Sequence, residues 1–240
     1  MCTVTYLPKG DTSFILTSNR DEDLSRPSAL PINSYTIHNK EIYFPKDPKA
    51  GGTWIAKGND FTVCLLNGAF VPHKSEGNYR KSRGFVLLDF FKYETQYDFI
   101  ANYDFKDIEP FSLIFVRHQD NKRGLCELKW DGIKTHHLNH DASLPHIWSS
   151  VTLYSEEVVK ERETWFYDWV KENEIFTKDT ILMFHHFGGT GDQKNDIVMN
   201  RSQKRTVSIC CVNKINEFET EMIYEDVINK KIYNTKVINS

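Results

Sequence analysis

Apolar and polar positions alternate in the first residues of the chain, which is the pattern of a half-buried β-strand. Residues 2–7 are rich in threonine, valine and tyrosine, and a short apolar run covers residues 14–18. Residues 8–11, Pro-Lys-Gly-Asp, separate the two runs and have the composition of a turn. The pattern predicts a β-hairpin, followed by a loop over the polar, proline-containing residues 19–31.

The hairpin pattern repeats before the period changes to that of a helix. Residues 52–56 and 61–66 resemble a second pair of strands that turns at residues 57–60. Ser82 then precedes a segment, ending at Phe91, whose apolar residues fall on one face at helical spacing. We therefore expect a helix with Ser82 as its N-cap.

The later segments complete an order of strands, helices, strands, helices and strands. This order is not the strict alternation of a doubly wound sheet, and short turns such as Asp131-Gly132 favour antiparallel pairing. The sequence predicts a single α+β domain over residues 1–240. The remaining predicted elements are a helix over 95–102, strands over 111–118, 124–130 and 133–138, helices over 155–173 and 177–187, and strands over 206–212 and 218–224.

The composition is that of an ordinary globular protein. The 240 residues are 40% hydrophobic and 26% charged, which is enough for one domain with a substantial core. The formal net charge of −3 gives no strong positive field, so we expect no nucleic-acid partner. No apolar run approaches the roughly 20 residues of a membrane span, and no secretory signal is visible. We therefore expect no membrane span and a cytoplasmic location.

The cysteines do not form the pattern of a disulfide framework or of a zinc site. Their number is odd and their spacing is irregular, which favours a reducing compartment, and we expect no metal and no cofactor. Three of them lie in apolar runs, where buried thiols are usually inert. The five cysteines are Cys2, Cys64, Cys126, Cys210 and Cys211.

Cys2 is the residue with the most distinctive chemistry. Removal of Met1, which is favoured by a small second residue, would leave a terminal cysteine with a free α-amine. Because such an amine has a pKa of roughly 7.7–8.0, it can accept a proton from the thiol of its own residue at neutral pH. One residue would then supply both nucleophile and base. The alternative is that Cys2 is an ordinary residue of the first strand.

A charged segment follows the second predicted strand, where a hairpin would bring it beside Cys2. The positive charge of Arg20 would lower the pKa of the thiol. Asp21 would orient the α-amine and hold Arg20, and Asn19 would fix the turn through its side chain. The alternative is a solvated charged loop.

These residues resemble the signature of a known family. Asn19-Arg20-Asp21-Glu22 matches the four letters after which the NRDE family, also called the Transport and Golgi organisation 2 family, is named. Further resemblances follow in the family's order along most of the chain, and a run of this length is more specific than any one motif. They are Ser25-Arg26-Pro27-Ser28, Gly51-Gly52-Thr53-Trp54, Leu65-Leu66-Asn67, Ser82-Arg83-Gly84, Phe111-Ser112-Leu113 and Arg205-Thr206.

The family is in turn similar to the N-terminal-nucleophile hydrolases, and this resemblance implies both a fold and a site. The implied fold has four layers, αββα, with the terminal cysteine in the central sheets. The implied nucleophile is Cys2, with Arg20 and Asp21 beside it. Asn67 would donate to the developing oxyanion, and Arg205 would close the site.

One position departs from the hydrolase pattern. The group has a further asparagine in the middle of the chain, and Ser150 stands in its place here. Loss of one oxyanion-type donor costs about 10²–10³ in turnover, so the change weakens the case for full amidase activity. Asn19, Trp54 and Ser150 remain candidate substrate-binding residues. For Trp54, packing in the core is an equal alternative.

His185 and His186 end the last predicted helix. Adjacent residues on a helix point about 100° apart, so the pair is a poor metal chelate. A cation is favourable at a helix C-terminus, and we interpret the pair in that structural sense.

Two functional hypotheses follow. The first is a Cys-dependent amide hydrolase or acyltransferase acting on a small molecule of unknown identity. The second is a non-catalytic carrier on the same scaffold, because members of the family have been linked to haem, acyl-CoA and lipid handling. A purely structural protein has little support, and the sequence leaves the oligomeric state open.

Overall fold

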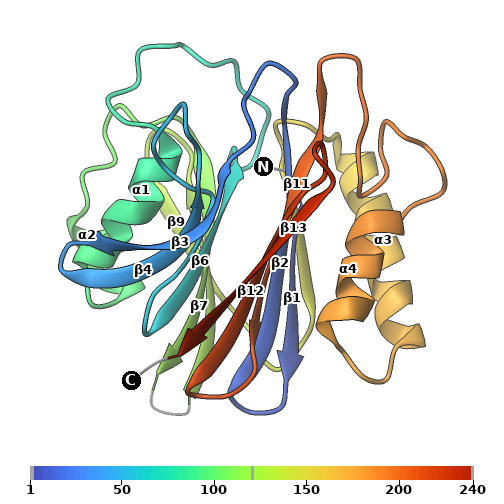
Figure 1. Cartoon of the computed structure of the whole chain (residues 1–240). Coiled ribbons are helices and arrows are strands. Elements are labelled where there is room, and N and C mark those ends of the chain that lie inside the picture. The colour runs from blue at the N-terminus through green and yellow to red at the C-terminus, as the bar shows by residue number, and fades with distance from the viewer. Residues whose placement is uncertain (1–2, 120–121, 239–240) are drawn as a thin grey trace.

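Two β-sheets face each other between two layers of helices (Figure 1). The computed structural model describes residues 3–119 and 122–238. The strands of the first sheet, in spatial order, are β10 (His146–Ser149), β1 (Thr3–Lys9), β2 (Ser13–Asp23), β11 (Lys204–Lys214), β12 (Glu219–Asp226) and β13 (Lys231–Ile238). The second sheet contains β3 (Leu30–Ile37), β4 (Lys40–Lys46), β5 (Ile55–Lys57), β6 (Phe61–Asn67), β7 (Phe111–Gln119), β8 (Lys122–Trp130) and β9 (Thr135–His140).

Helices cover the outer face of each sheet. The helices α1 (Arg83–Asp89) and α2 (Gln96–Asn102), with a short 3₁₀ turn η1 (Phe90–Lys92) between them, lie outside the second sheet. The helices α3 (Glu156–Glu172) and α4 (Lys178–Phe187) lie outside the first sheet. All pairs of neighbouring strands in the two sheets are antiparallel. The predicted α+β class, with four αββα layers and antiparallel sheets, is confirmed.

Strand alternation in the first sheet supplies two separate hydrophobic cores. Tyr6 and Phe14 point between the sheets, where they join the larger core. Leu7 and Ile15, the neighbours of those residues, point outward and pack with Phe166 of α3. Because successive side chains of a strand face opposite sides, neighbouring apolar residues of this sheet pack against the second sheet on one face and against the helices on the other.

The predicted loop over residues 19–31 is wrong in its first part. Strand β2 continues through Asp23, and the ladder with β11 extends to the pair Asp23 and Lys204. The backbone hydrogen bonds of this ladder stabilise a strand that the polar side chains alone do not predict. The motif Asn19 to Glu22 therefore lies within a sheet, and its side chains alternate between the two faces.

Other strands were not predicted. The strands β3, β4, β10 and β13 are half-exposed or short, and their side chains lack a clear alternation of apolar and polar positions. The second predicted hairpin, the strands of residues 111–140 and all four helices are present close to their expected bounds. Among the described residues, no helix combines the length and the apolar character needed to cross a membrane.

The helices α3 and α4 begin with side-chain caps. The Ser155 side chain accepts a hydrogen bond from the Val158 N–H at the start of α3, and Thr177 forms a capping box with Thr180 at the start of α4. Ser82 is the N-cap of α1 as expected, although its hydroxyl makes no capping hydrogen bond among the described residues.

Candidate active site

The candidate site lies at the end of the sandwich where β1 begins. Thr3, the first described residue, pairs with Asn19 of β2 on one side and with Ser149 of β10 on the other. The predicted nucleophile Cys2 lies outside the described residues. The start of β1 and the Asn19-to-Asp23 part of β2 thus belong to the same end of the molecule (Figure 1).

Arg20 lies buried between the two sheets. Its guanidinium is 2.7 Å from Asp47 Oδ2 and 3.3 Å from Glu22 Oε2, and it lies 4.8 Å from the centre of the Trp54 ring. Only 4% of the Arg20 side chain is exposed, so these partners compensate for the loss of water around a fixed positive charge. The prediction that Asp21 holds Arg20 is not supported, because Glu22 and Asp47 are its ion-pair partners among the described residues.

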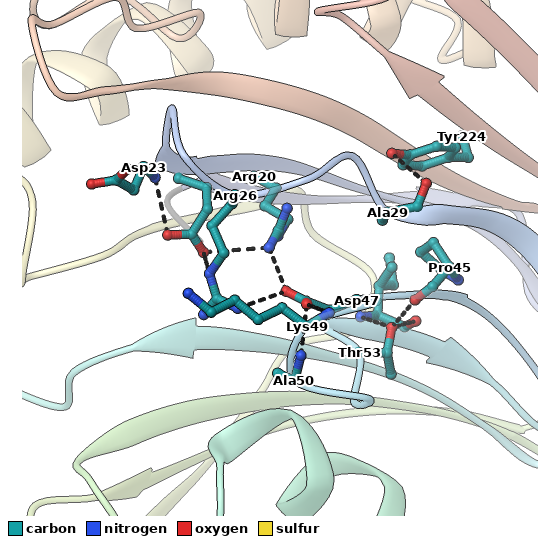
Figure 2. A network of polar contacts seen from close by, with 12 residues as sticks. Arg20, Asp23, Arg26, Ala29, Pro45, Asp47, Lys49, Ala50, Thr53 and Tyr224 are labelled. Atoms are coloured by element: carbon teal, nitrogen blue, oxygen red, sulfur yellow. Dashed lines mark hydrogen bonds and ion pairs between the residues drawn. The ribbon is translucent and has the colours of Figure 1, made fainter. Parts of the chain in front are cut away.

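Asp47 is a site residue that the sequence analysis missed. Its Oδ1 accepts hydrogen bonds from the backbone N–H groups of Lys49 and Ala50, each at 2.9 Å, and its Oδ2 faces both Arg20 and Arg26 (Figure 2). One carboxylate therefore shapes the loop before the glycine pair and binds two arginines. An aspartate whose side chain can bond the backbone two residues on is a recognised turn signal, and it was available in the sequence as Asp-Pro-Lys-Ala.

Asp21 makes its contacts with a different set of residues. Its carboxylate accepts hydrogen bonds from the hydroxyl of Tyr154 at 2.6 Å and from that of Thr206 at 2.5 Å. It is adjacent to Arg20 on a strand, and successive side chains of a strand point to opposite faces. Tyr154 is itself covered by the guanidinium of Arg162, which lies 3.6 Å from its ring centre and donates to the Thr3 hydroxyl at 2.5 Å.

Asn19 fixes a helix rather than a turn. Its amide nitrogen donates to the carbonyls of His185 and Ile197 at 3.2 and 2.9 Å, so its oxygen accepts from His185 Nδ1 at 2.6 Å. With Nδ1 donating, His185 Nε2 accepts from the Thr5 hydroxyl at 2.7 Å. The interpretation of His185 as a helix-terminal cation is wrong, because burial lowers the pKa of its imidazole to about 3.

A cavity of about 110 Å³ brings together the candidates Arg20, Trp54 and Asn67. We call it the site cavity, and its lining includes Arg20, Arg26, Asp47, Trp54, Asn67 and Arg83. Trp54 is 3% exposed and also packs in the main core, so both interpretations of this residue apply. Its buried indole N–H has no hydrogen-bond partner among the described residues.

Two glycines bring α1 against the site cavity. A Cβ on Gly52 would lie 2.7 Å from the backbone carbon of Gly84, and a Cβ on Gly84 would lie 2.8 Å from the carbonyl oxygen of Thr53. Since real Cβ atoms do not approach backbone this closely, only glycine permits the crossing. The contact places Arg83, the first residue of α1, beside the residues of the first sheet.

Ser150 lies beside Asn67 but is not a free donor. Its hydroxyl donates to the backbone carbonyl of Asn67 at 2.7 Å and is 2.9 Å from the hydroxyl of Thr152. A serine has one hydroxyl proton, and this geometry uses it to tie β10 to the end of β6. Ser150 is therefore tied to the backbone of Asn67, and it is not among the residues that line the site cavity.

Arg205 lies next to this end of the sheet but does not line the site cavity. It pairs with Glu22 in the ladder between β11 and β2. Its Nε is buried without a hydrogen-bond partner among the described residues.

The four described cysteines are all buried. Burial raises the pKa of the thiols of Cys64 and Cys211 to about 12 and that of Cys126 to about 11, and it raises the pKa of Cys210 well above its ordinary value. These thiols are protonated at neutral pH and shielded from solvent. They are inert core groups, as predicted for three of them.

The comparisons with known proteins agree with the sequence motifs. A sequence model of a family described as Transport and Golgi organisation 2 matches residues 1–237. A search of curated proteins finds no match.

Proposed function

The chain belongs to the Transport and Golgi organisation 2 family, and from this premise we propose that it is a Cys-dependent N-terminal-nucleophile amide hydrolase or acyltransferase. The observation that carries the proposal is the site cavity itself. Arg20, Trp54 and Asn67, which come from three separate segments, line one cavity at the end of the sandwich where β1 begins. A catalytic site requires such a meeting of residues, whereas a solvated charged loop does not.

The proposed reaction begins at Cys2 after removal of Met1. The α-amine takes the thiol proton, and the thiolate attacks the acyl carbon of the substrate. The side-chain amide of Asn67 donates a hydrogen bond to the oxygen that becomes negative. The ammonium then gives its proton to the leaving nitrogen, the C–N bond breaks, and a thioester remains on Cys2. Water hydrolyses the thioester, or an acceptor amine takes the acyl group.

The surrounding residues support this reaction by holding the reacting groups in place. The peptide bond to Thr3 joins Cys2 to β1, and Arg162 binds the Thr3 hydroxyl. Arg20 supplies a fixed positive charge that stabilises a nearby thiolate. Asp21 is anchored by Tyr154 and Thr206, so its carboxylate is ready to orient the terminal amine.

The proposal is tested by hydrolysis of a panel of acyl 4-nitroanilides and acyl thioesters. We expect the mature wild-type protein to release product from at least one compound, and Cys2→Ala to abolish it. Asn67→Ala should lower kcat by about 10²–10³ with a small change in KM, because the oxyanion contact forms only in the transition state. Cys126→Ala, which removes a buried thiol of β8 that does not line the site cavity, is the matched control. Equal activity of Cys2→Ala and wild type would overturn the proposal.

One observation favours a second candidate function, that of a small-molecule carrier. The proton of Ser150 is engaged with the Asn67 carbonyl, so the site has one oxyanion donor fewer than the hydrolase pattern requires. A carrier needs the cavity but not the nucleophile. Haem or acyl-CoA binding that is unchanged in Cys2→Ala, in a protein inactive on every compound of the panel, would favour the carrier. Binding lost together with the thiol would implicate Cys2 directly.

A further inference from the structure

The site cavity is lined by more positively than negatively charged side chains. Three arginines and two carboxylates line it. Both carboxylates, Glu22 and Asp47, are bound by Arg20 and by Arg26, at distances between 2.7 and 3.8 Å. These four residues form a closed network of two cations and two anions, and Arg83 remains outside it.

The carboxylate partner of Arg83 is a residue that does not line the cavity. Its guanidinium lies 3.2 Å from Glu109 Oε2, and Glu109 is not among the lining residues. The other oxygen of Glu109 is 3.1 Å from His73 Nε2, so this carboxylate is shared. A second Arg83 contact, to the carbonyl of Pro110 at 3.4 Å, is long for a hydrogen bond. The site cavity therefore contains one arginine with donor capacity that its own lining carboxylates do not use.

Trp54, which also lines the cavity, has a buried donor without a partner among the described residues. This donor is the indole N–H. A buried donor without a partner costs about 1–3 kcal/mol. Burial also lowers the pKa of the Arg83 guanidinium, and the negative charges of Glu109 and Glu22 oppose this shift.

We propose that the site cavity selects substrates that carry a carboxylate on their acyl portion, and that Arg83 is the specificity-determining residue that binds it. The proposal rests on the hydrolase function proposed above and narrows it to acid-bearing acyl groups. Arginine suits this role because its planar donors match the two oxygens of a carboxylate.

The crossing of Gly52 and Gly84 explains why Arg83 can serve the site. This backbone contact brings the first residue of α1 to a cavity whose other members belong to β2, β6 and the loops near β5. The close packing leaves the position of Arg83 little freedom. A fixed cation discriminates between substrates better than a mobile one, because less ordering is needed on binding.

The test compares matched acyl 4-nitroanilides that differ only in charge. Succinyl, glutaryl and adipoyl compounds end in a carboxylate, and butyryl, pentanoyl and hexanoyl compounds are their neutral partners. We expect wild type to prefer at least one acidic member by tenfold or more in kcat/KM. Arg83→Met should bring this ratio close to one, and Arg83→Lys should give an intermediate ratio. Arg80→Gln removes an arginine three residues earlier, outside the lining, and should retain the wild-type ratio.

A binding measurement separates failure of this proposal from failure of the hydrolase function. Calorimetry with glutarate and with the neutral glutaramide requires no turnover. Glutarate binding that weakens tenfold or more in Arg83→Met would support the carboxylate site even if no compound is hydrolysed. Hydrolysis without preference for any acidic compound, or equal glutarate affinity in wild type and Arg83→Met, would overturn the proposed carboxylate site.

Discussion

The two ends of the β-sandwich both bury positive charge, but they do so in opposite ways. At the end where β1 begins, Arg20 is paired with Asp47 and borders the site cavity. At the other end, where β1 turns into β2, two lysines are buried, Lys57 at 1% and Lys214 at 3% exposure. Each lysine lies close enough to the other for repulsion to contribute to the lowered pKa of Lys57.

The two ends differ in the groups that surround a buried charge and in how easily the charged group loses its proton. Burial lowers the pKa of Lys57 to about 8 and that of its neighbour His118 to about 3, so these groups release their protons more easily. An arginine remains charged at all ordinary pH values, and the site end compensates it with carboxylates. At the site end carboxylates contact the buried cation directly, whereas at the opposite end burial and repulsion from Lys214 lower the pKa of Lys57 against the attraction of Asp60 and Glu41.

The largest expected effect comes from breaking the ion pair at the site end. Asp47→Ala leaves the buried Arg20 without its closest partner, and we expect a loss of about 3–5 kcal/mol in the free energy of unfolding. Urea unfolding at pH 7 measures this loss. Glu22→Gln is the control, because Glu22 is more exposed and its removal should cost about 1 kcal/mol or less. Equal losses in the two variants would contradict the account.

The second-largest effect is expected when acid lowers the free energy of unfolding through the buried histidine at the opposite end. The folded-state pKa of His118 is about 3, far below that of an unfolded histidine, so between pH 6.5 and 3 the unfolded chain binds more protons. Stability should therefore fall with decreasing pH, by about 1.4 kcal/mol per pH unit for this histidine. His185 has the same lowered pKa and should add a similar slope.

Urea unfolding of wild type and His118→Gln at pH 7.0 and 5.5 tests this slope. The variant should lose less stability on acidification than wild type does. His137→Gln, which changes an exposed histidine of β9, is the matched control. An identical pH dependence in wild type and His118→Gln would show that His118 is not buried in its neutral form.

A smaller effect of opposite sign is expected for Lys57→Met. At pH 7 this substitution removes a buried cation from the neighbourhood of Lys214, and we expect a gain of about 1–2 kcal/mol. Above pH 8 the folded wild type loses the proton of Lys57 while the unfolded chain keeps it, so wild-type stability rises and the gain shrinks. Melting curves from pH 7 to 9.5 measure this change. A loss of stability at pH 7 would mean that the contacts of Lys57 outweigh its burial.

The smallest effect is expected for Ser150→Ala. The substitution removes one hydrogen bond to the Asn67 carbonyl and should cost about 1 kcal/mol in stability. If Ser150 only positions Asn67, its removal should lower kcat less than Asn67→Ala does. A fall in kcat as large as that of Asn67→Ala would instead make Ser150 a direct oxyanion donor.

Sequence reasoning succeeded where local chemistry decides the structure. The turn at residues 8–11, the helix start at Ser82 and the helical period each depend on interactions within a few residues. The motif around Arg20 and the glycine pair also identified the segments that line the cavity. These features depend on residue type and spacing, which the sequence displays directly.

It failed where the partner is distant in the chain. Asn19 to Asp23 are polar, and only pairing with β11 makes them a strand. Asp21 meets Tyr154 and Thr206 across 133 and 185 positions, and no local pattern announces such contacts. Ser150 was identified as a departure from the hydrolase pattern. Its hydrogen bond to the Asn67 carbonyl at the end of β6 could not be predicted, because only the fold brings the two residues together.

The measurement that tests the central claim most directly is the intact mass of the purified protein before and after brief iodoacetamide treatment at pH 7.5. The account predicts that Met1 is absent and that a single alkyl group is added, on Cys2, because the other four cysteines are buried with raised thiol pKa values. Retention of Met1, or alkylation that spares Cys2 in the folded protein, would contradict the claim that a terminal cysteine is the nucleophile.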